Sequence, residues 1–462
     1  MTELHSAGTG TRMTTARARR RRAIRMMMVI LIPLAVWTVA GLIALWPKDV
    51  SSHVNTEATS YGVSGVSYPS GRVTNIARIS CEGVAGSSSG VNTQVCANLS
   101  VQLLAGDDQG KTVVVPVTNA IYTSGISIGQ RVTLVRIPPI DGQPAQYSFS
   151  DFSRGTPLLV VTLIFAAAVI LVARWRGFAT LLALAFAGAI LVTFLFPALV
   201  SGSNPILVGL TAASAILFVA LYAAHGLNVR TTTALVGSLA ALLVTAGLGW
   251  VAVRWTHLTG ITAEDDYVLV ASAPDLLLSS VVMCGIILAG VGVLIDVTLT
   301  QASAVWSAAD SEPSARRLFA KAMRTGREHA AANVSTIAFV TLGAALPVLL
   351  LLLVYPRPLL EMLQTEQFAD ELVRILVAST GVVLAIPLTT AIAVALVRLS
   401  RGAPKPRKTK PDRDGAPPSG ADAEATPRER RWRRGKDEFE DIDDFSDLRE
   451  PAEETRRPPR RS

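Results

Sequence analysis

Long apolar runs, separated by short polar segments, make up most of this chain after its first 150 residues. Each run has about 18 to 24 residues, the length that an α-helix needs to cross the hydrocarbon core of a bilayer. A mean hydropathy of +0.41 and 50% hydrophobic residues are high for a soluble chain of 462 residues. The pattern predicts an all-α polytopic membrane bundle of about eight transmembrane helices: Ile24–Trp46, Pro157–Ala173, Phe178–Val200, Pro205–Ala224, Thr233–Val253, Leu276–Leu299, Val334–Tyr355 and Ile375–Val397.

A different pattern fills residues 47–153, which are polar and rich in Gly, Ser, Thr and Val. Apolar and polar residues alternate there in five short segments, separated by turns that contain Gly, Asp or Pro. We therefore expect a small β domain between the first and second membrane helices, either a sandwich or a barrel of the OB kind. The predicted strands are Arg72–Ser80, Ala97–Leu104, Lys111–Thr118, Arg131–Ile137 and Ala145–Phe149.

The distribution of Lys and Arg predicts the orientation. Residues 1–23 are polar and end in a cluster of arginines, which holds the start of the first helix in the cytoplasm. Basic residues recur in alternate loops between the later apolar runs, whereas the other loops are acidic or, at residues 201–204, uncharged. The prediction is a membrane protein with both termini cytoplasmic, residues 47–153 extracytoplasmic, and a bundle of about seven further helices over residues 154–397.

The last part of the chain, residues 398–462, is rich in Pro, Arg, Asp and Glu and poor in apolar residues, which predicts a disordered cytoplasmic tail. It contains a basic block, Arg428–Lys436, followed by an acidic block, Asp437–Asp447. The basic block either touches anionic lipid headgroups or is simply solvated.

Cysteine usage and motifs exclude several kinds of site. Cys81 and Cys96 lie in the segment predicted to be outside the cytoplasm, where a disulfide between them is expected to persist. Cys284 lies in an apolar run, where it is expected to pack as a small residue. The sequence shows no metal-ligand spacing, phosphate-binding loop or nucleophile motif, so we expect no metal, cofactor or catalytic residue and no enzyme. The formal charge of +8 reflects membrane topology, so nucleic acid is not an expected partner.

The stretch from Cys284 to Pro347 carries the best candidate for a working site. At helical spacing, Gly285, Ala289 and Gly292 share a face that another helix is expected to approach closely, and Asp296 continues that face near the cytoplasmic end of its span. Polar residues follow on both sides of the intervening basic loop. The predicted polar-network or transport residues are Asp296, Thr300, Gln301, Arg327, Glu328, His329, Asn333 and Thr336.

Two interpretations of Asp296 remain open. A carboxylate in a membrane helix is costly and usually faces a partner or water. In the first interpretation, Asp296 pins a helix end through an ion pair with Arg327 or His329. In the second, Asp296 carries charge on an ion or proton pathway.

Several ordered motifs resemble the YibE/F-like family of bacterial multi-pass membrane proteins, from about Gly129 to Val397. The fullest are Asp-Val-Thr-Leu-Thr-Gln-Ala-Ser-Ala-Val-Trp at 296–306 and Gly-Arg-Glu-His at 326–329, and the first has the form of the actinobacterial branch. The resemblance implies an integral membrane protein with an N-terminal extracytoplasmic region, and it brings no established reaction or substrate.

The first functional hypothesis is a transporter or permease-like protein with a polar site between the sixth and seventh membrane helices, acting on a small ion or solute. The alternative is a membrane scaffold or cell-envelope assembly factor that recruits envelope protein partners through its extracytoplasmic domain. The lipid bilayer is a partner in both.

Overall fold

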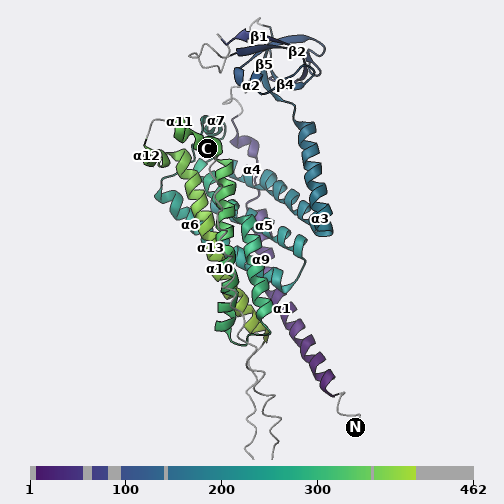
Figure 1. The fold of residues 1–462 in the computed structure, drawn as a ribbon, viewed down its shortest axis with the longest axis vertical. Coiled ribbons are helices and arrows are strands. Elements are labelled where there is room, and N and C mark those ends of the chain that lie inside the picture. The colour runs from purple at the N-terminus through teal and green to yellow at the C-terminus, as the bar shows by residue number, and fades with distance from the viewer. Residues whose placement is uncertain (1–6, 56–64, 82–94, 140–143, 355–357, 402–462) are drawn as a thin grey trace, which may run out of the picture. The chain divides into compact units, whose positions relative to one another are not determined.

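The computed structural model describes residues 7–55, 65–81, 95–139, 144–354 and 358–401 (Figure 1). The tail with its basic and acidic blocks, and residue Tyr355 at the end of one predicted span, lie outside these ranges.

The predicted β domain is present, and all five strands form close to their expected positions. They make one antiparallel sheet in the order β3-β2-β1-β4-β5. The two edge strands, β3 and β5, contact each other, so the sheet curls on itself. The elements are β1 Ser70–Ser80, β2 Val95–Leu103, β3 Thr112–Val117, the short helix α2 Asn119–Thr123, β4 Arg131–Ile137 and β5 Gln146–Phe152.

Alternating burial explains why these strands form where they do. On β2, Leu99, Val101 and Leu103 point into the domain core and are fully buried. Val101 packs directly over Gly71 of β1, where any side chain would overlap it. A disulfide joins Cys81 to Cys96, as predicted, with their Cα atoms 5.0 Å apart.

A charged cluster ties the β2–β3 turn to strands β4 and β5. Asp108 in the turn accepts hydrogen bonds from Lys111 Nζ at 2.6 Å, Arg136 Nε at 3.1 Å and the Tyr147 hydroxyl at 2.5 Å. These hydrogen bonds, that from Lys111 first, hold the pKa of Asp108 well below its usual range. The cluster therefore fastens the turn only while Asp108 is ionised.

The rest of the described chain is helical. Six helices are long and apolar enough to cross a membrane, or up to seven if the bent pair α10–α11 is one span. The predicted number of about eight also counts α3 as two spans and stays a prediction. The helices are α1 Ala7–Ala44, α3 Gly155–Ile190, α4 Phe196–Val200, α5 Pro205–His225, α6 Val229–Trp255, α7 Glu264–Ser272, α8 Leu278–Ala289, α9 Val291–Ala308, α10 Ala315–Ala344, α11 Leu346–Val354, α12 Leu359–Leu363 and α13 Glu366–Arg401, with a 3₁₀ turn at Val50–His53 and π-helical turns at Leu191–Leu195.

A sharp kink divides α3 between the two spans predicted from the sequence. Arg174 has a non-helical backbone with φ of 52°, which non-glycine residues seldom adopt. Just beyond it, Gly177 sits so close to the carbonyl of Val169 that a Cβ atom would overlap it. The kink therefore lies in the short gap between the predicted spans Pro157–Ala173 and Phe178–Val200.

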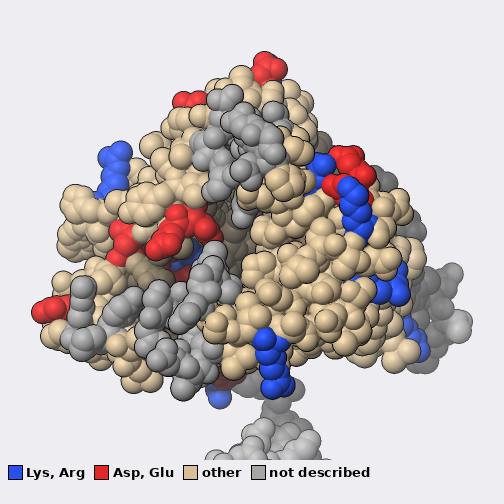
Figure 2. Space-filling view, turned by 90° about the horizontal axis from the view of Figure 1, so that it is seen from above, with Lys and Arg blue, Asp and Glu red and all other residues tan. Residues whose placement is uncertain are grey.

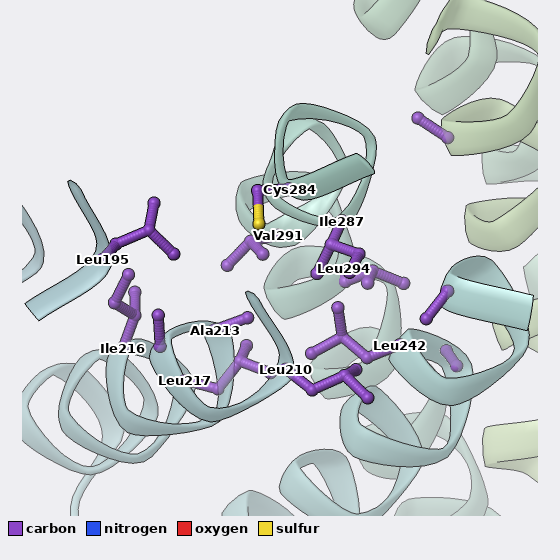
Figure 3. Close-up of a cluster of buried hydrophobic side chains, with 14 of the residues drawn as sticks. Leu195, Leu210, Ala213, Ile216, Leu217, Leu242, Cys284, Ile287, Val291 and Leu294 are labelled. Carbon is purple, nitrogen blue, oxygen red and sulfur yellow. The ribbon is translucent and has the colours of Figure 1, made fainter. Parts of the chain in front are cut away.

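The main core lies where α5, α6, α8 and α9 meet. Figure 3 shows Leu210, Leu217, Leu242 and Ile287 converging there, and all four are buried. The thiol of Cys284 on α8 faces the start of α5 and donates to the carbonyl oxygen of Pro205 at 3.2 Å. Its expected role as a small packing residue agrees with this position.

Two reciprocal contacts fix α6 against α13. Gly237 of α6 lies against Thr389, and Gly381 of α13 lies against Thr245, each so closely that a Cβ atom on the glycine would overlap the threonine hydroxyl. The two helices are antiparallel, because the order of the contacts reverses along them. Their register is used below to compare depths.

The end of the bundle that carries α7 and α12 is rich in acidic residues, and the view in Figure 2 shows acidic side chains gathered there. Glu366, at the start of α13, accepts hydrogen bonds from the backbone N–H groups of Thr259 and Gly260 at 2.6 and 2.8 Å. His53, after α1, pairs with Asp275 at 2.7 Å. These contacts close that end of the bundle.

Candidate functional site

The side chain of Gln301 joins three helices at the centre of the predicted site. It is 1% exposed and projects from α9 between α10 and α13. With its amide oriented to satisfy both ends, Nε2 donates to Thr390 Oγ1 at 3.0 Å and to the carbonyl oxygen of Ala322 at 3.2 Å, and Oε1 accepts from Gly326 N at 3.1 Å. Because every polar atom of the buried amide has a partner, Gln301 is a well-satisfied structural link.

Gly326 makes this link possible. A Cβ atom at this position would overlap Ile386 Cγ2 and stand 2.7 Å from the Gln301 amide. Two motifs that are well separated in the sequence, Thr-Gln-Ala-Ser at 300–303 and Gly-Arg-Glu-His at 326–329, therefore meet here, with Thr390 between them.

The opposite side of α9 is held on α6 by two hydroxyl contacts. Ser238 Oγ and Thr298 Oγ1 are 2.7 Å apart and buried, and Trp306 Nε1 donates to Thr233 Oγ1 at 3.1 Å. Together with the contacts of Gln301, they fix the register of α9 against α6, α10 and α13.

The register of the helices gives the depth of each predicted residue. The Gly–Thr contacts make Ala241 of α6 level with Ala385 of α13. These positions lie near the middle of the two apolar runs, which end at Arg230 and Arg254 in α6 and at Arg398 and Arg374 in α13. Both helices therefore mark out the same apolar layer, with its arginine-flanked ends level.

In this frame, the predicted residues Asp296, Arg327, Glu328 and His329 lie at the middle of the apolar layer. Arg327 and His329 follow Gly326, which packs on Ile386 at the centre of the α13 run. Asp296 lies two residues from Thr298, and Thr298 contacts Ser238 near the centre of the α6 run. The packing of α9 on α6 thus makes Asp296 level with the middle of the α6 run, whereas the sequence predicts a position near the cytoplasmic end of its span.

The predicted residues fall into two groups by exposure. Gln301 is buried, and Thr300 and Asn333 are half-buried. The remaining five lie on the outer faces of α9 and α10: Asp296, Arg327, Glu328, His329 and Thr336 are exposed.

Ion pairs do not explain the exposed group. Glu328 lies 3.7 Å from Arg324 one turn earlier on α10. Asp296 forms no ion pair or hydrogen bond with another described residue, so the expected pairs with Arg327 and His329 do not form here.

A charged, outward-facing surface at this depth is costly in hydrocarbon. A charged side chain at the bilayer centre costs about 2.5 to 3.5 kcal/mol. For Asp296 and Arg327 together this is about 6 kcal/mol, a large part of the total stability of about 5 to 15 kcal/mol that folded proteins have. We call the exposed charged residues of α9 and α10 near this depth, Asp296, Arg324, Arg327, Glu328 and His329, the polar face.

The glycines expected to allow close helix approach behave differently from one another. The helix breaks at Gly290, so the face from Gly285 to Asp296 is shared between α8 and α9. A Cβ atom on Gly285 would meet the guanidinium of Arg374 at 3.8 Å, whereas nothing lies within 4 Å of that position at Gly292. The prediction of close approach is therefore wrong for Gly292.

Sequence reasoning missed a second polar group at the other end of α13. Asp370 is 4% exposed and accepts a hydrogen bond from Arg374 Nη2 at 2.6 Å, and its Oδ1 atom has no described partner. The spacing of an acid four residues before a base was the available signal. In the described part of the chain, no group of three or more His, Cys, Asp and Glu residues is placed to hold a metal ion.

Comparison with known proteins gives one family and no individual relative. The family model described as "YibE/F-like protein" matches residues 161–399, more than half of the chain. No curated protein and no solved structure matches significantly.

Proposed function

The chain belongs to the YibE/F-like protein family, and we propose that it is a transporter or permease-like protein of the bacterial plasma membrane, in which a polar substrate moves along the polar face. The proposal rests on one observation: Asp296, Arg327 and His329 lie at the same depth as the middle of the apolar runs in α6 and α13. Charged residues inside membrane segments usually line substrate or ion pathways.

The roles of the residues follow from their positions. Asp296 is the charge carrier, because it is exposed and no described residue neutralises it. Arg327 and His329 supply counter-charge at the same depth. Thr300 and Asn333 are both half-buried and add polar lining. Gln301 holds α9, α10 and α13 together.

The ends of the apolar layer support the proposed orientation. Arg230 and Arg398 lie at one end, whereas the opposite end carries the acidic residues of α7 and the start of α13. By the positive-inside rule the first end is cytoplasmic, which puts both termini in the cytoplasm and residues 47–153 outside.

Water access to the polar face is the direct test. Single cysteines replace Asp296 or His329, and a membrane-impermeant methanethiosulfonate reagent is applied from the cytoplasmic side of inverted vesicles. Leu384→Cys is the matched control, since Leu384 is exposed on α13 at nearly the same depth. The native cysteines give little background, because Cys284 is buried and the other two are bonded.

We expect Asp296→Cys and His329→Cys to react and Leu384→Cys to remain unmodified. If all three are equally unreactive, the face is dry and the transport proposal fails.

Ligand-dependent stability tests the role of Asp296. Purified wild type and Asp296→Asn are melted in detergent across pH and a panel of monovalent and divalent cations. An ion that binds the native state raises the apparent stability. A response present in wild type and absent from a folded Asp296→Asn assigns ion binding to this carboxylate, whereas a variant that is less stable and never responds assigns it a structural role.

The alternative function, a membrane scaffold, rests on a different observation: the β domain has its own core and disulfide. Deletion of residues 65–153 separates the two functions. A scaffold loses its crosslinked envelope partners, whereas a transporter keeps the reactivity of cysteines on the polar face.

A further inference from the structure

The polar face lies on the outer side of the helical bundle. The side chains of Arg324 and Glu328 are 86% and 65% exposed. Helix α10 packs mainly on α9 and α13 and leads into α11, and these helices lie side by side in Figure 1. A substrate on this face therefore has protein on one side and lipid on the other.

Apolar side chains border the polar face at similar depth. On α13, Val383 and Leu384 are 38% and 41% exposed, and they lie level with Glu328 and His329 by the packing of Gly326 on Ile386. Beyond the polar face on α10, Phe339 is 73% exposed. These surfaces suit hydrocarbon chains, whereas the polar face suits a hydrated or charged group.

Because the exposed surface of α10 is basic, the group that binds there is an anion. Between its first turn and the centre of the apolar layer, α10 exposes five bases and one acid, Glu328. Arg317 and Arg327 are ten residues apart, so the basic row runs about 15 Å along the helix, roughly half the thickness of the hydrocarbon core. The exposed bases are Arg316, Arg317, Lys321, Arg324 and Arg327.

From these observations we propose that the substrate is a phospholipid with an anionic headgroup. The phosphate moves along the basic row of α10 from the cytoplasmic surface to Arg327, while the acyl chains stay in the membrane beside Val383 and Leu384. Arginine is well suited to this role, because its planar guanidinium binds phosphate oxygens in pairs. This inference rests on the proposed transport function and names its substrate class.

Lipid movement is measured in phosphatidylcholine proteoliposomes that contain a trace of fluorescent NBD-phosphatidylglycerol in both leaflets. Dithionite added outside bleaches only the outer leaflet, so loss of more than half of the signal reports movement between leaflets. The same assay with NBD-phosphatidylcholine, and uptake of inorganic phosphate, are run in parallel. The variants are Arg327→Gln, Arg327→Lys and, as a control for overall charge away from the face, Arg398→Gln.

We expect phosphatidylglycerol to cross faster than in empty liposomes and faster than NBD-phosphatidylcholine. Arg327→Gln should slow it about tenfold, the size expected for loss of one hydrogen bond to a charged group. Arg327→Lys keeps the charge but not the paired hydrogen bonds, so its rate should fall between those of Arg327→Gln and wild type. Arg398→Gln should retain most of the rate. Melting curves of each variant confirm that it is folded.

Three results would overturn the lipid proposal. Equal rates for the two lipids remove the anionic headgroup as the recognised feature, and equal loss in Arg327→Gln and Arg398→Gln removes the basic row. If neither lipid moves while cysteines at Asp296 and His329 react with the thiol reagent, transport stands with a water-soluble substrate, which phosphate uptake then tests. If those cysteines are also unreactive, both proposals fail together.

Discussion

The contact between Gly326 and Gln301 allows a stability prediction with a matched control in the same helix. In Gly326→Ala the new methyl group overlaps Ile386 Cγ2 and displaces the Gln301 amide. Overpacking a core costs about 1 to 3 kcal/mol. A buried amide that loses its partners costs a further amount of about 1 to 3 kcal/mol. Against this loss, alanine favours the helix by about 1 kcal/mol relative to glycine. The expected net loss is therefore about 3 kcal/mol.

The control is Gly343→Ala, also in α10, where nothing lies within 4 Å of the added Cβ atom. It should leave stability unchanged or raise it by up to about 1 kcal/mol. Both variants are unfolded reversibly in mixed micelles by denaturant, monitored by tryptophan fluorescence and circular dichroism. The reasoning is refuted if Gly326→Ala is as stable as Gly343→Ala.

A double variant sharpens the test. Gln301→Ala alone should cost about 1 to 3 kcal/mol, because Gly326 N and Thr390 lose a partner. Since the alanine methyl at 326 then meets no amide, the two changes together should cost less than their sum. Strict additivity would show that the amide is not the group that the methyl displaces.

Other regions give three further predictions. Gly237→Ala in α6, which forces a methyl into Thr389, should lower the melting temperature, whereas Gly247→Ala in the same helix, with open space around it, should not. Reduction of the Cys81–Cys96 disulfide, which joins residues separated by 15 positions, should destabilise the β domain by about 3 kcal/mol, seen as faster proteolysis of that domain in the intact chain under reducing conditions. Because the pKa of Asp108 is lowered in the folded protein, the carboxylate binds a proton more readily in the unfolded chain. The stabilisation is therefore present above pH 3.8, the ordinary pKa, and is lost as the pH falls below it. Asp108→Asn should melt at a lower temperature than wild type at neutral pH, and the difference should shrink below about pH 4.

The sequence predicted the β domain well because burial alternates along parts of its strands, as from Leu99 to Leu103 on β2. Each strand has one face in the core, so the period of two in the sequence marks the strand directly. All five strands begin within two residues of the predicted position, and Arg131–Ile137 matches at both ends. The disulfide followed from the compartment predicted for its two cysteines.

The helical part was harder, because hydropathy averages the faces of a helix. The predicted span Val334–Tyr355 begins 19 positions too late, since α10 starts at Ala315 and its first half is apolar only where Leu318 and Ala322 pack against α9 and α13. Its charged outer surface concealed that half of the helix from a search for apolar runs.

Depth was also out of reach of a single sequence. The position of Asp296 depends on how α9 packs on α6, which two hydroxyl contacts decide. Likewise, Gln301 was predicted as a polar-network residue, but its partner Thr390 is 89 positions away, inside an apolar run that gave no sign of a polar contact.

The interlocked glycines and threonines of α6 and α13 restrict the way in which this bundle can change shape. Each helix presents one small and one branched residue, eight positions apart, and its partner presents the complementary pair. If the two helices slid along each other, Thr245 and Thr389 would move off the glycines that they contact and against larger side chains. A shear motion between α6 and α13 is therefore blocked. Any conformational cycle must therefore carry α6 and α13 as one rigid body and place its hinge elsewhere. The 65° bend between α10 and α11 marks one position where the chain already departs from a continuous helix.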